Sequence, residues 1–351
     1  MTATAKSGNT LNWRGAAAKV VPAALSLFIA LLIGALLLIL SGRNPVEAYG
    51  ALLSGAFGSP ARLAETLVKM TPFLILAISV SVSFRCGVWN IGAEGQLILG
   101  AIASFTVALL LRSWPALVVL PLTIVAGILG GALWGGIAGV LKARFNANEV
   151  ITTSMLNFIA VYLLAYLVNG PLKDPEGFNF PQSPLINEAF QLPRLLTGSR
   201  LNVAFLVALA LIVVALLFWR STLGFRTEIV GASRRVATHA GLDVNRTIVL
   251  VSVITGAVAG VAGWGEIFGI HYRLIDAIAV GMGSLAVVVA LLGELHPLGM
   301  VVSAFLFAVL VVGGNAMERG AGVPFALVDV IQGSIILLVL ARSFIFRGRR
   351  S

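Results

Sequence analysis

Long apolar runs separated by short polar segments repeat along almost the whole chain. A membrane-spanning helix needs about 20 predominantly apolar residues, and runs of roughly this length recur between residues 20 and 342. The pattern predicts an all-α integral membrane protein with about ten transmembrane helices. The predicted spans are 20–40, 64–83, 94–111, 115–141, 149–169, 201–219, 247–270, 276–293, 298–313 and 323–342.

The distribution of Lys and Arg predicts the orientation, because cytoplasmic loops of membrane proteins carry an excess of both. With the N-terminus inside, the alternation of spans places most of the 24 basic residues in the cytoplasm. Both termini are therefore predicted to be cytoplasmic. The predicted organisation is a cytoplasmic tail at 1–19, one transmembrane domain at 20–345 with an outer loop at 170–200 and a cytoplasmic loop at 220–247, and a basic tail at 346–351.

The composition excludes several other classes of protein. Hydrophobic residues make up 59% of the 351 residues and charged residues only 11%, which is too little polar surface for a soluble domain. The net charge of +10 does not indicate nucleic-acid binding, because the basic residues lie at the ends of apolar runs. A single cysteine, Cys86, excludes an internal disulfide.

One polar interruption, FRCGVWNIGAEGQLILGA at 84–101, stands between two apolar runs. Asn90 is predicted to cap the following helix, and Glu94 falls one turn later, near the positive end of that helix. A charged side chain facing lipid is costly, and irregular backbone at membrane depth needs protein or a water-filled cavity beside it. Two interpretations stay open: a broken helix lining a polar passage that includes Gln96, or a helix start at the cytoplasmic interface.

Glycines recur four residues apart in the fourth predicted span. This spacing places them on one helix face, where another backbone can approach closely. We interpret them as packing residues that do not bind substrate. They are Gly127, Gly131, Gly135 and Gly139.

The cytoplasmic loop contains signals for a short helix at about 234–240. Ser233 is a good N-cap, and Gly241 is a good residue just beyond the C-terminus. A plain connection needs only a few residues, so we hypothesise that this helix docks into a cytoplasmic partner. The alternative is a solvated basic loop.

No segment matches the phosphate-binding pattern G-x-x-x-x-G-K-[ST], and no nucleophile–base pair or metal-binding spacing is evident. The chain is therefore predicted to be no enzyme and to bind no cofactor. The polar segments at 85–96 and 271–284 begin similar sequences of helices, which suggests two pseudo-repeated halves, as in many transporters. A stand-alone carrier that couples to protons through Glu94 or Glu266 is the alternative to an ATP-driven one.

Several ordered blocks resemble the permease subunits of ABC-type importers. They include GVWNIGAEGQLILGA, NEVITTSMLNFIA and GASRRVATHAGLDVNRT. The similarity covers about residues 20–345 and is strongest to the nucleoside and simple-sugar branch, which is related to the permeases for ribose and branched-chain amino acids. It implies a type II-like importer permease in the bacterial inner membrane, with a nucleoside, or otherwise a simple sugar, as its cargo.

The resemblance also implies partners and residue roles. Such a permease pairs with a second, often non-identical permease chain, with cytoplasmic ATPase subunits that hold ATP and Mg²⁺, and with a periplasmic or lipid-anchored substrate-binding protein. The implied ATPase-coupling residues are Gly231, Ala232, Arg234, Arg235, Ala240 and Gly241. The implied residues of the translocation path are Asn90, Glu94, Gln96 and Asn157.

Overall fold

A computed structural model describes residues 13–279 and 281–347. Within these residues the regular elements are helices, accompanied by two isolated β-bridges, so the predicted all-α class is confirmed. The helices are α1 Trp13–Leu40, α2 Pro45–Phe57, α3 Pro60–Arg85, α4 Ala93–Leu110, α5 Ala116–Phe145, α6 Glu149–Asn169, η1 Glu188–Phe190, α7 Ala204–Arg220, α8 Thr222–Ala232, α9 Arg234–His239, α10 Val244–Glu266, η2 Ile267–His271, α11 Met282–Leu292, α12 Pro297–Ala321 and α13 Phe325–Arg347.

Every predicted span overlaps a helix, but several helices differ in length from the spans predicted for them. Among the described residues, six helices are long and apolar enough to cross a membrane: α3, α4, α5, α6, α10 with η2, and α12. A seventh is counted if α7 and α8, which meet at a bend of 71°, form one broken span. The helix in the predicted span 276–293 is only 11 residues long. At 1.5 Å per residue it covers about 16 Å, roughly half the hydrocarbon thickness.

Several helical segments lie outside the predicted spans, among them α2, α8 and the first turns of α1. α2 and α8 were read as parts of connecting segments, and α1 begins at Trp13, inside the predicted N-terminal tail. The side chain of Ser221 accepts a hydrogen bond from the N–H of Gly224 and caps α8, so a new helix starts where polar residues had suggested a loop. Residues 1–12 and 348–351 of the two predicted tails lie outside the described residues.

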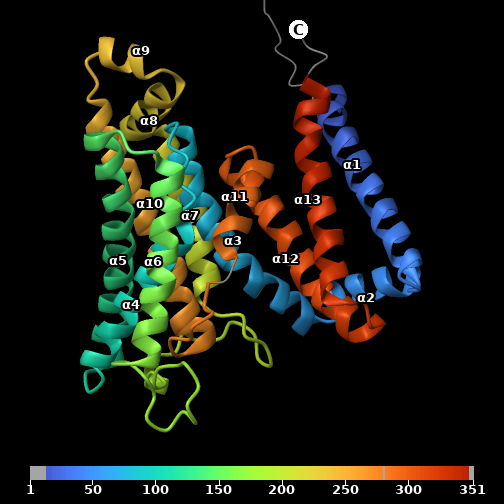
Figure 1. The fold of residues 1–351 in the computed structure, drawn as a ribbon, viewed down its shortest axis with the longest axis horizontal. Coiled ribbons are helices and arrows are strands. Elements are labelled where there is room, and N and C mark those ends of the chain that lie inside the picture. Colours follow the sequence, from blue (N-terminus) through green and yellow to red (C-terminus); the bar gives the residue numbers. More distant parts are fainter. Residues whose placement is uncertain (1–12, 280, 348–351) are drawn as a thin grey trace, which may run out of the picture. The chain divides into compact units, whose positions relative to one another are not determined.

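Contacts between Cα atoms divide the chain into two compact units. The first combines the described residues up to Leu52 with those from Gly314 onward, and α1 packs against α13 in it. The second runs from Leu53 to Gly313 and contains α3 to α11 (Figure 1). The single transmembrane domain predicted for 20–345 stays a prediction.

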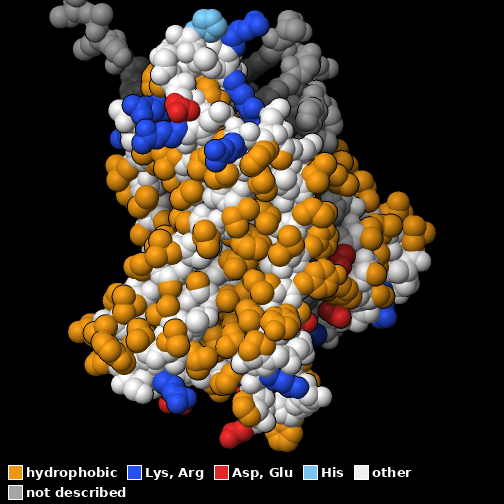
Figure 2. All heavy atoms as spheres, turned by 60° about the vertical axis from the view of Figure 1, so that its left-hand side comes forward, with side chains coloured by type: hydrophobic (Ala, Val, Ile, Leu, Met, Phe, Trp, Pro, Cys, Tyr) orange, Lys and Arg blue, Asp and Glu red, His pale blue; other side chains and the backbone are white. Residues whose placement is uncertain are grey.

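In the second unit α10 lies at the centre, packed against α3, α4 and α5. The middle of α3 and the end of α10 are buried, whereas α5 and α6 expose leucine and aromatic side chains such as Leu133 and Tyr162. Figure 2 shows a broad hydrophobic band on one face, with Lys and Arg gathered toward its ends. This distribution suits a surface that faces lipid between two aqueous boundaries.

The four regularly spaced glycines of α5 lie against α10. A Cβ atom on Gly131 would overlap the carbonyl oxygen of Gly256 and lie 2.8 Å from the Cα of Gly260. Gly127 faces Gly260 and Trp264, while Gly135 and Gly139 face Ser252. The backbones of α5 and α10 therefore approach more closely than side chains would allow, as small-residue spacing permits in membrane helices.

Candidate functional site: the break between α3 and α4 and the segment that contacts it

The polar interruption forms a break between two helices. α3 ends at Arg85 and α4 begins at Ala93, with Gly87 at a positive φ of 71° in the turn between them. The prediction that Asn90 is the N-cap of α4 is wrong, because Gly92 occupies that position. The side chain of Asn90 instead accepts a hydrogen bond of 2.8 Å from the N–H of Gly92. A short polar side chain thus satisfies a local backbone donor in a turn, one step before the helix starts.

α6 supplies further hydrogen-bond partners of the broken backbone. Asn157 donates from Nδ2 to the carbonyl oxygen of Ile91 at 2.9 Å and accepts at Oδ1 from the N–H of Gly95 at 2.8 Å. Thr153, four residues earlier on the same helix face, accepts from the N–H of Ile91 at 3.2 Å. Irregular backbone within a membrane protein needs such partners, because lipid offers none. Asn157 was implied by the resemblance, whereas Thr153 was not predicted, although its i,i+4 spacing to Asn157 places both side chains on one helix face.

Glu94 connects the first turn of α4 to the start of α11. Its carboxylate interacts with the backbone N–H groups of Gly281 and Gly283. A Cβ atom on Gly283 would lie only 2.7 Å from the Cβ of Glu94, so the two helix starts are in close contact. An acidic side chain at a helix N-terminus interacts favourably with the helix dipole. Glu94 therefore lies at the N-terminus of two helices, its own and α11.

Gln96, two residues after Glu94 in α4, is buried. The residue is 1% exposed, and its side-chain oxygen has no hydrogen-bond partner among the described residues. A buried unsatisfied acceptor costs about 1–3 kcal/mol. Gln96 is therefore a destabilising polar group in this conformation of the bundle.

The short helix predicted at about 234–240 is confirmed as α9, Arg234–His239. Ser233 accepts a hydrogen bond from the N–H of Val236 at its start. At its end Gly241 has φ of 76°, and the N–H of Leu242 donates to the carbonyl oxygen of Ala237 at 3.0 Å. This is the Schellman arrangement, which glycine favours. Two arginines of the helix, Arg234 and Arg235, are exposed.

Gly231, near the end of α8, packs directly against the backbone at the end of α3. A Cβ atom on Gly231 would overlap the carbonyl oxygen of Arg85 and lie 3.0 Å from the carbonyl carbon of Cys86. Ala237 of α9 is fully buried in one hydrophobic cluster with Cys86 and Val88. The end of α3, the turn that follows it and the α8–α9 corner therefore form one packed assembly.

Arg85 adds a polar connection to the same corner. Its Nη1 lies 2.9 Å from Oε1 of Glu228 on α8, and its guanidinium lies 4.3 Å from the centre of the Trp219 ring. The guanidinium group is planar and weakly hydrated, so it can stack on an aromatic ring while it also forms an ion pair. The side chain thus joins the last turn of α3 to both α7 and α8.

Cys86 is the only cysteine of the chain and lies at the centre of this assembly. Burial raises the pKa of its thiol to about 11, although the nearby Arg234 charge lowers it in part. The thiol is therefore neutral at physiological pH, and a neutral thiol is a poor nucleophile. Its environment is that of a packing residue.

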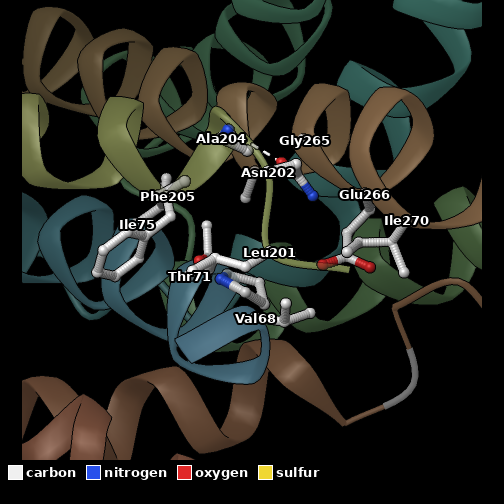
Figure 3. Close-up of a pocket in the computed structure, with 12 residues that line it drawn as sticks. Val68, Thr71, Ile75, Leu201, Asn202, Ala204, Phe205, Gly265, Glu266 and Ile270 are labelled. Atoms are coloured by element: carbon white, nitrogen blue, oxygen red, sulfur yellow. Dashed lines mark hydrogen bonds between the residues drawn. The ribbon is translucent and has the colours of Figure 1, made fainter. Parts of the chain in front are cut away.

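Glu266, the second carboxylate considered for proton coupling, faces a small cavity between α3, α7 and α10 (Figure 3). The residue is 5% exposed, and its Oε2 lies 3.2 Å from Nε2 of His271. The cavity has a volume of about 10 Å³, which is room for about one water molecule. In this conformation Glu266 therefore borders a space that is too small for a nucleoside or a sugar.

The predicted site residues thus fall into three places. Asn90, Glu94 and Asn157 meet at the break, and Gly231, Ala232, Arg234, Arg235, Ala240 and Gly241 belong to the α8–α9 corner that contacts it. The glycines of α5 lie elsewhere, along the contact with α10.

Comparison with known proteins assigns the chain to a family. A family model described as the permease component of a branched-chain amino acid transport system matches residues 62–340. The glucose ABC transporter permease of Haloferax volcanii is 36% identical over 93% of this chain and 88% of its own length. The guanosine ABC transporter permease of Bacillus subtilis is 34% identical over 92% and 93%, respectively. The nucleoside ABC transporter permease of Lactococcus lactis is 32% identical over 93% and 92%. No solved structure gives a significant match.

The three relatives are all permeases of ABC transporters, which favours that interpretation over a proton-coupled carrier. The match also confirms the resemblance seen in the sequence blocks, since it covers most of the chain. The several long apolar helices agree with a multi-pass protein of the inner membrane. The chain therefore belongs to the permease-component family of branched-chain amino acid transport systems and is the membrane-spanning permease subunit of an ABC importer.

Proposed function

We propose that this permease passes a nucleoside, or otherwise a simple sugar, from an external binding protein to the cytoplasm. Two of the relatives described above carry guanosine or nucleoside in their names and one carries glucose. The observation that carries the proposal is the polar but mostly uncharged character of the break, where the amides of Asn90 and Asn157 lie close to one carboxylate, Glu94. Amide side chains can form transient hydrogen bonds with hydroxyl groups and with a base.

A strain that lacks this permease should lose nucleoside uptake. We expect uptake of labelled guanosine and adenosine to fall to background and to return with the wild-type gene, because import then depends on this passage. Uptake of glucose, measured in the same cells, serves as the comparison. Lost glucose uptake with unchanged nucleoside uptake would contradict the nucleoside assignment and support the sugar.

The motor of this importer is proposed to be a separate ATPase that binds ATP and Mg²⁺. Support comes from the surface of α9, where Arg234, Arg235 and Val236 are exposed while Ala237 is buried. An exposed, capped helix with both cationic and apolar groups suits docking into a groove. The proposed complex also contains a second permease, identical or homologous, and an external substrate-binding protein.

Motion of the ATPase is proposed to reach the passage through the Gly231–Arg85 contact. Backbone packed on backbone transmits displacement without slack, because no flexible side chain lies between the two segments. Arg85 and its partner Glu228 add a second connection between the same elements. A displacement of α9 would then shift the turn at 86–92, where the hydrogen bonds of Asn90 lie.

The finer topology is also a proposal: about ten crossings in two pseudo-repeated halves, with both termini in the cytoplasm. The support is a helix in every predicted range and the excess of basic residues on one side. The short helix α11 would complete its crossing together with the non-helical segment before it. The contact of Glu94 with the start of α11 would then join the broken crossings of the two halves.

The translocation path is proposed to run along the break, past Asn90, Glu94, Gln96 and Asn157. Replacing Gln96 with leucine should reduce the import rate by about tenfold, because a side-chain amide that is proposed to line the path is lost. The same change removes a buried unsatisfied oxygen, so the melting temperature should stay equal or rise. Import is measured in vesicles that contain the whole complex.

Gln191→Leu, the same substitution in the outer loop, serves as the matched control. It should leave the import rate of the complex near that of the wild type. Equal import kinetics for Gln96→Leu and the wild type would remove Gln96 from the path.

A further inference from the structure

A groove beside the α8–α9 corner combines free cationic groups with an apolar floor. It lies between α8 and the start of α10, and its volume is about 400 Å³. Arg226 and Arg246 line one part of it, and neither takes part in an ion pair found among the described residues. Much of the remaining lining is apolar, including Phe218, Leu223, Leu250 and Ile254, and it also contains Thr227 and Thr247.

The two kinds of lining occupy different depths along α10. Arg246, Leu250 and Ile254 are spaced four residues apart and therefore share one helix face. At 1.5 Å per residue, Leu250 and Ile254 lie about 6 and 12 Å farther along the helix than Arg246. Because α10 is one of the helices able to cross the membrane, the groove runs from a cationic end at the aqueous boundary into the hydrocarbon region.

We propose that this groove binds one anionic phospholipid of the cytoplasmic leaflet. The phosphate would lie at Arg226 and Arg246, and an acyl chain would lie along Leu250 and Ile254. Arginines near the membrane surface attract anionic headgroups, and their side chains can reach the phosphate while their stems stay on apolar surface. Asp243, the one acidic group in the lining, is engaged as the N-cap of α10 by accepting from the N–H of Arg246 at 2.9 Å.

The depth of the groove favours a lipid over an acidic surface of the ATPase. A soluble subunit that docks on α9 could reach the two arginines, but it could not fill the part lined by Leu250 and Ile254 within the membrane. Leu250 is 40% exposed there, and a lipid chain covers such a surface without any special fit.

The test compares lipid retention by the purified full-length chain and two double variants. The chain is placed in nanodiscs of phosphatidylcholine with a minority of phosphatidylglycerol, released gently, and the lipids that stay bound are counted by native mass spectrometry. The wild type should retain one phosphatidylglycerol in preference to phosphatidylcholine. Arg226→Gln/Arg246→Gln should weaken this retention at least about tenfold, whereas Arg144→Gln/Arg220→Gln, with the same loss of charge on exposed neighbouring helix ends, should retain it.

A second variant tests the apolar part without changing charge. Leu250→Trp should fill the groove and lower phosphatidylglycerol retention in a chain that still elutes as a folded monodisperse species. Unchanged retention in both Arg226→Gln/Arg246→Gln and Leu250→Trp would overturn the proposal. So would an equal loss in the two double variants, which would indicate general surface charge. Full lipid retention together with failure of Arg226→Gln/Arg246→Gln to co-purify the ATPase would assign the arginines to the ATPase interface and also overturn it.

Discussion

Gly231→Ala should uncouple ATP hydrolysis from import. The added Cβ would overlap the carbonyl oxygen of Arg85 and lie 2.8 Å from its carbonyl carbon, and both atoms belong to backbone that no rotamer change can move. The end of α8 must then separate from the end of α3. The exposed face of α9, with Arg234 and Arg235, is unchanged. We therefore expect the ATPase to bind and to hydrolyse ATP, while cargo imported per ATP falls by about tenfold or more.

Gly241→Ala is the matched control in the same segment. Its Cβ meets no atom within 4 Å, although its φ of 76° is strained for alanine. That strain costs about 1 kcal/mol and loosens the cap of α9 without touching α3. Gly241→Ala should therefore lower ATPase affinity and keep the ratio of import to hydrolysis. If Gly231→Ala kept the wild-type ratio of import to ATP hydrolysis, the contact of Gly231 with Arg85 would not be the route of coupling.

Local signals predicted the parts of this site that depend on neighbouring residues. Ser233 and Gly241 indicated α9 within about one residue, since caps are local features. The pattern of apolar residues predicted a helix in each of the ten ranges. Hydropathy did not predict the length of α11, because an apolar run does not reveal where its backbone becomes irregular.

Contacts between distant segments were not predictable from these signals. Gly231 was selected by resemblance, and nothing in the local sequence indicated that it meets Arg85, more than a hundred residues earlier. The same holds for Asn157, whose amide bonds the backbone of Ile91 and Gly95. The side chain of Asn90 accepts from a backbone N–H two residues on, as a cap would, but it is not the N-cap of α4. The helix began two residues later than its sequence suggested, and the side chain formed a turn instead of a cap.

The close approach of α5 and α10 gives the second large expected effect. Gly131→Ala should destabilise the chain by about 1–3 kcal/mol or more, as overpacking does in a dense core. Its Cβ would overlap the carbonyl oxygen of Gly256 and lie 2.8 Å from both the N and the Cα of Gly260. All of these atoms are backbone, so α10 must move as a whole. Because α10 also packs against α3 and α4, the displacement would extend to the helices on either side of the break.

Gly136→Ala on the same helix separates this effect from helix propensity. Replacing glycine with alanine inside a helix contributes up to about 1 kcal/mol of stability when space allows. At Gly136 the nearest atom to an added Cβ is Cγ2 of Val253 at 3.2 Å, which belongs to a side chain that can shift slightly. The free energy of unfolding, measured on the purified chain in mixed micelles, should therefore equal or exceed that of the wild type in Gly136→Ala. In Gly131→Ala it should be well below that of the wild type. Equal stability of the two variants would contradict the close contact between the backbones of α5 and α10 at Gly131.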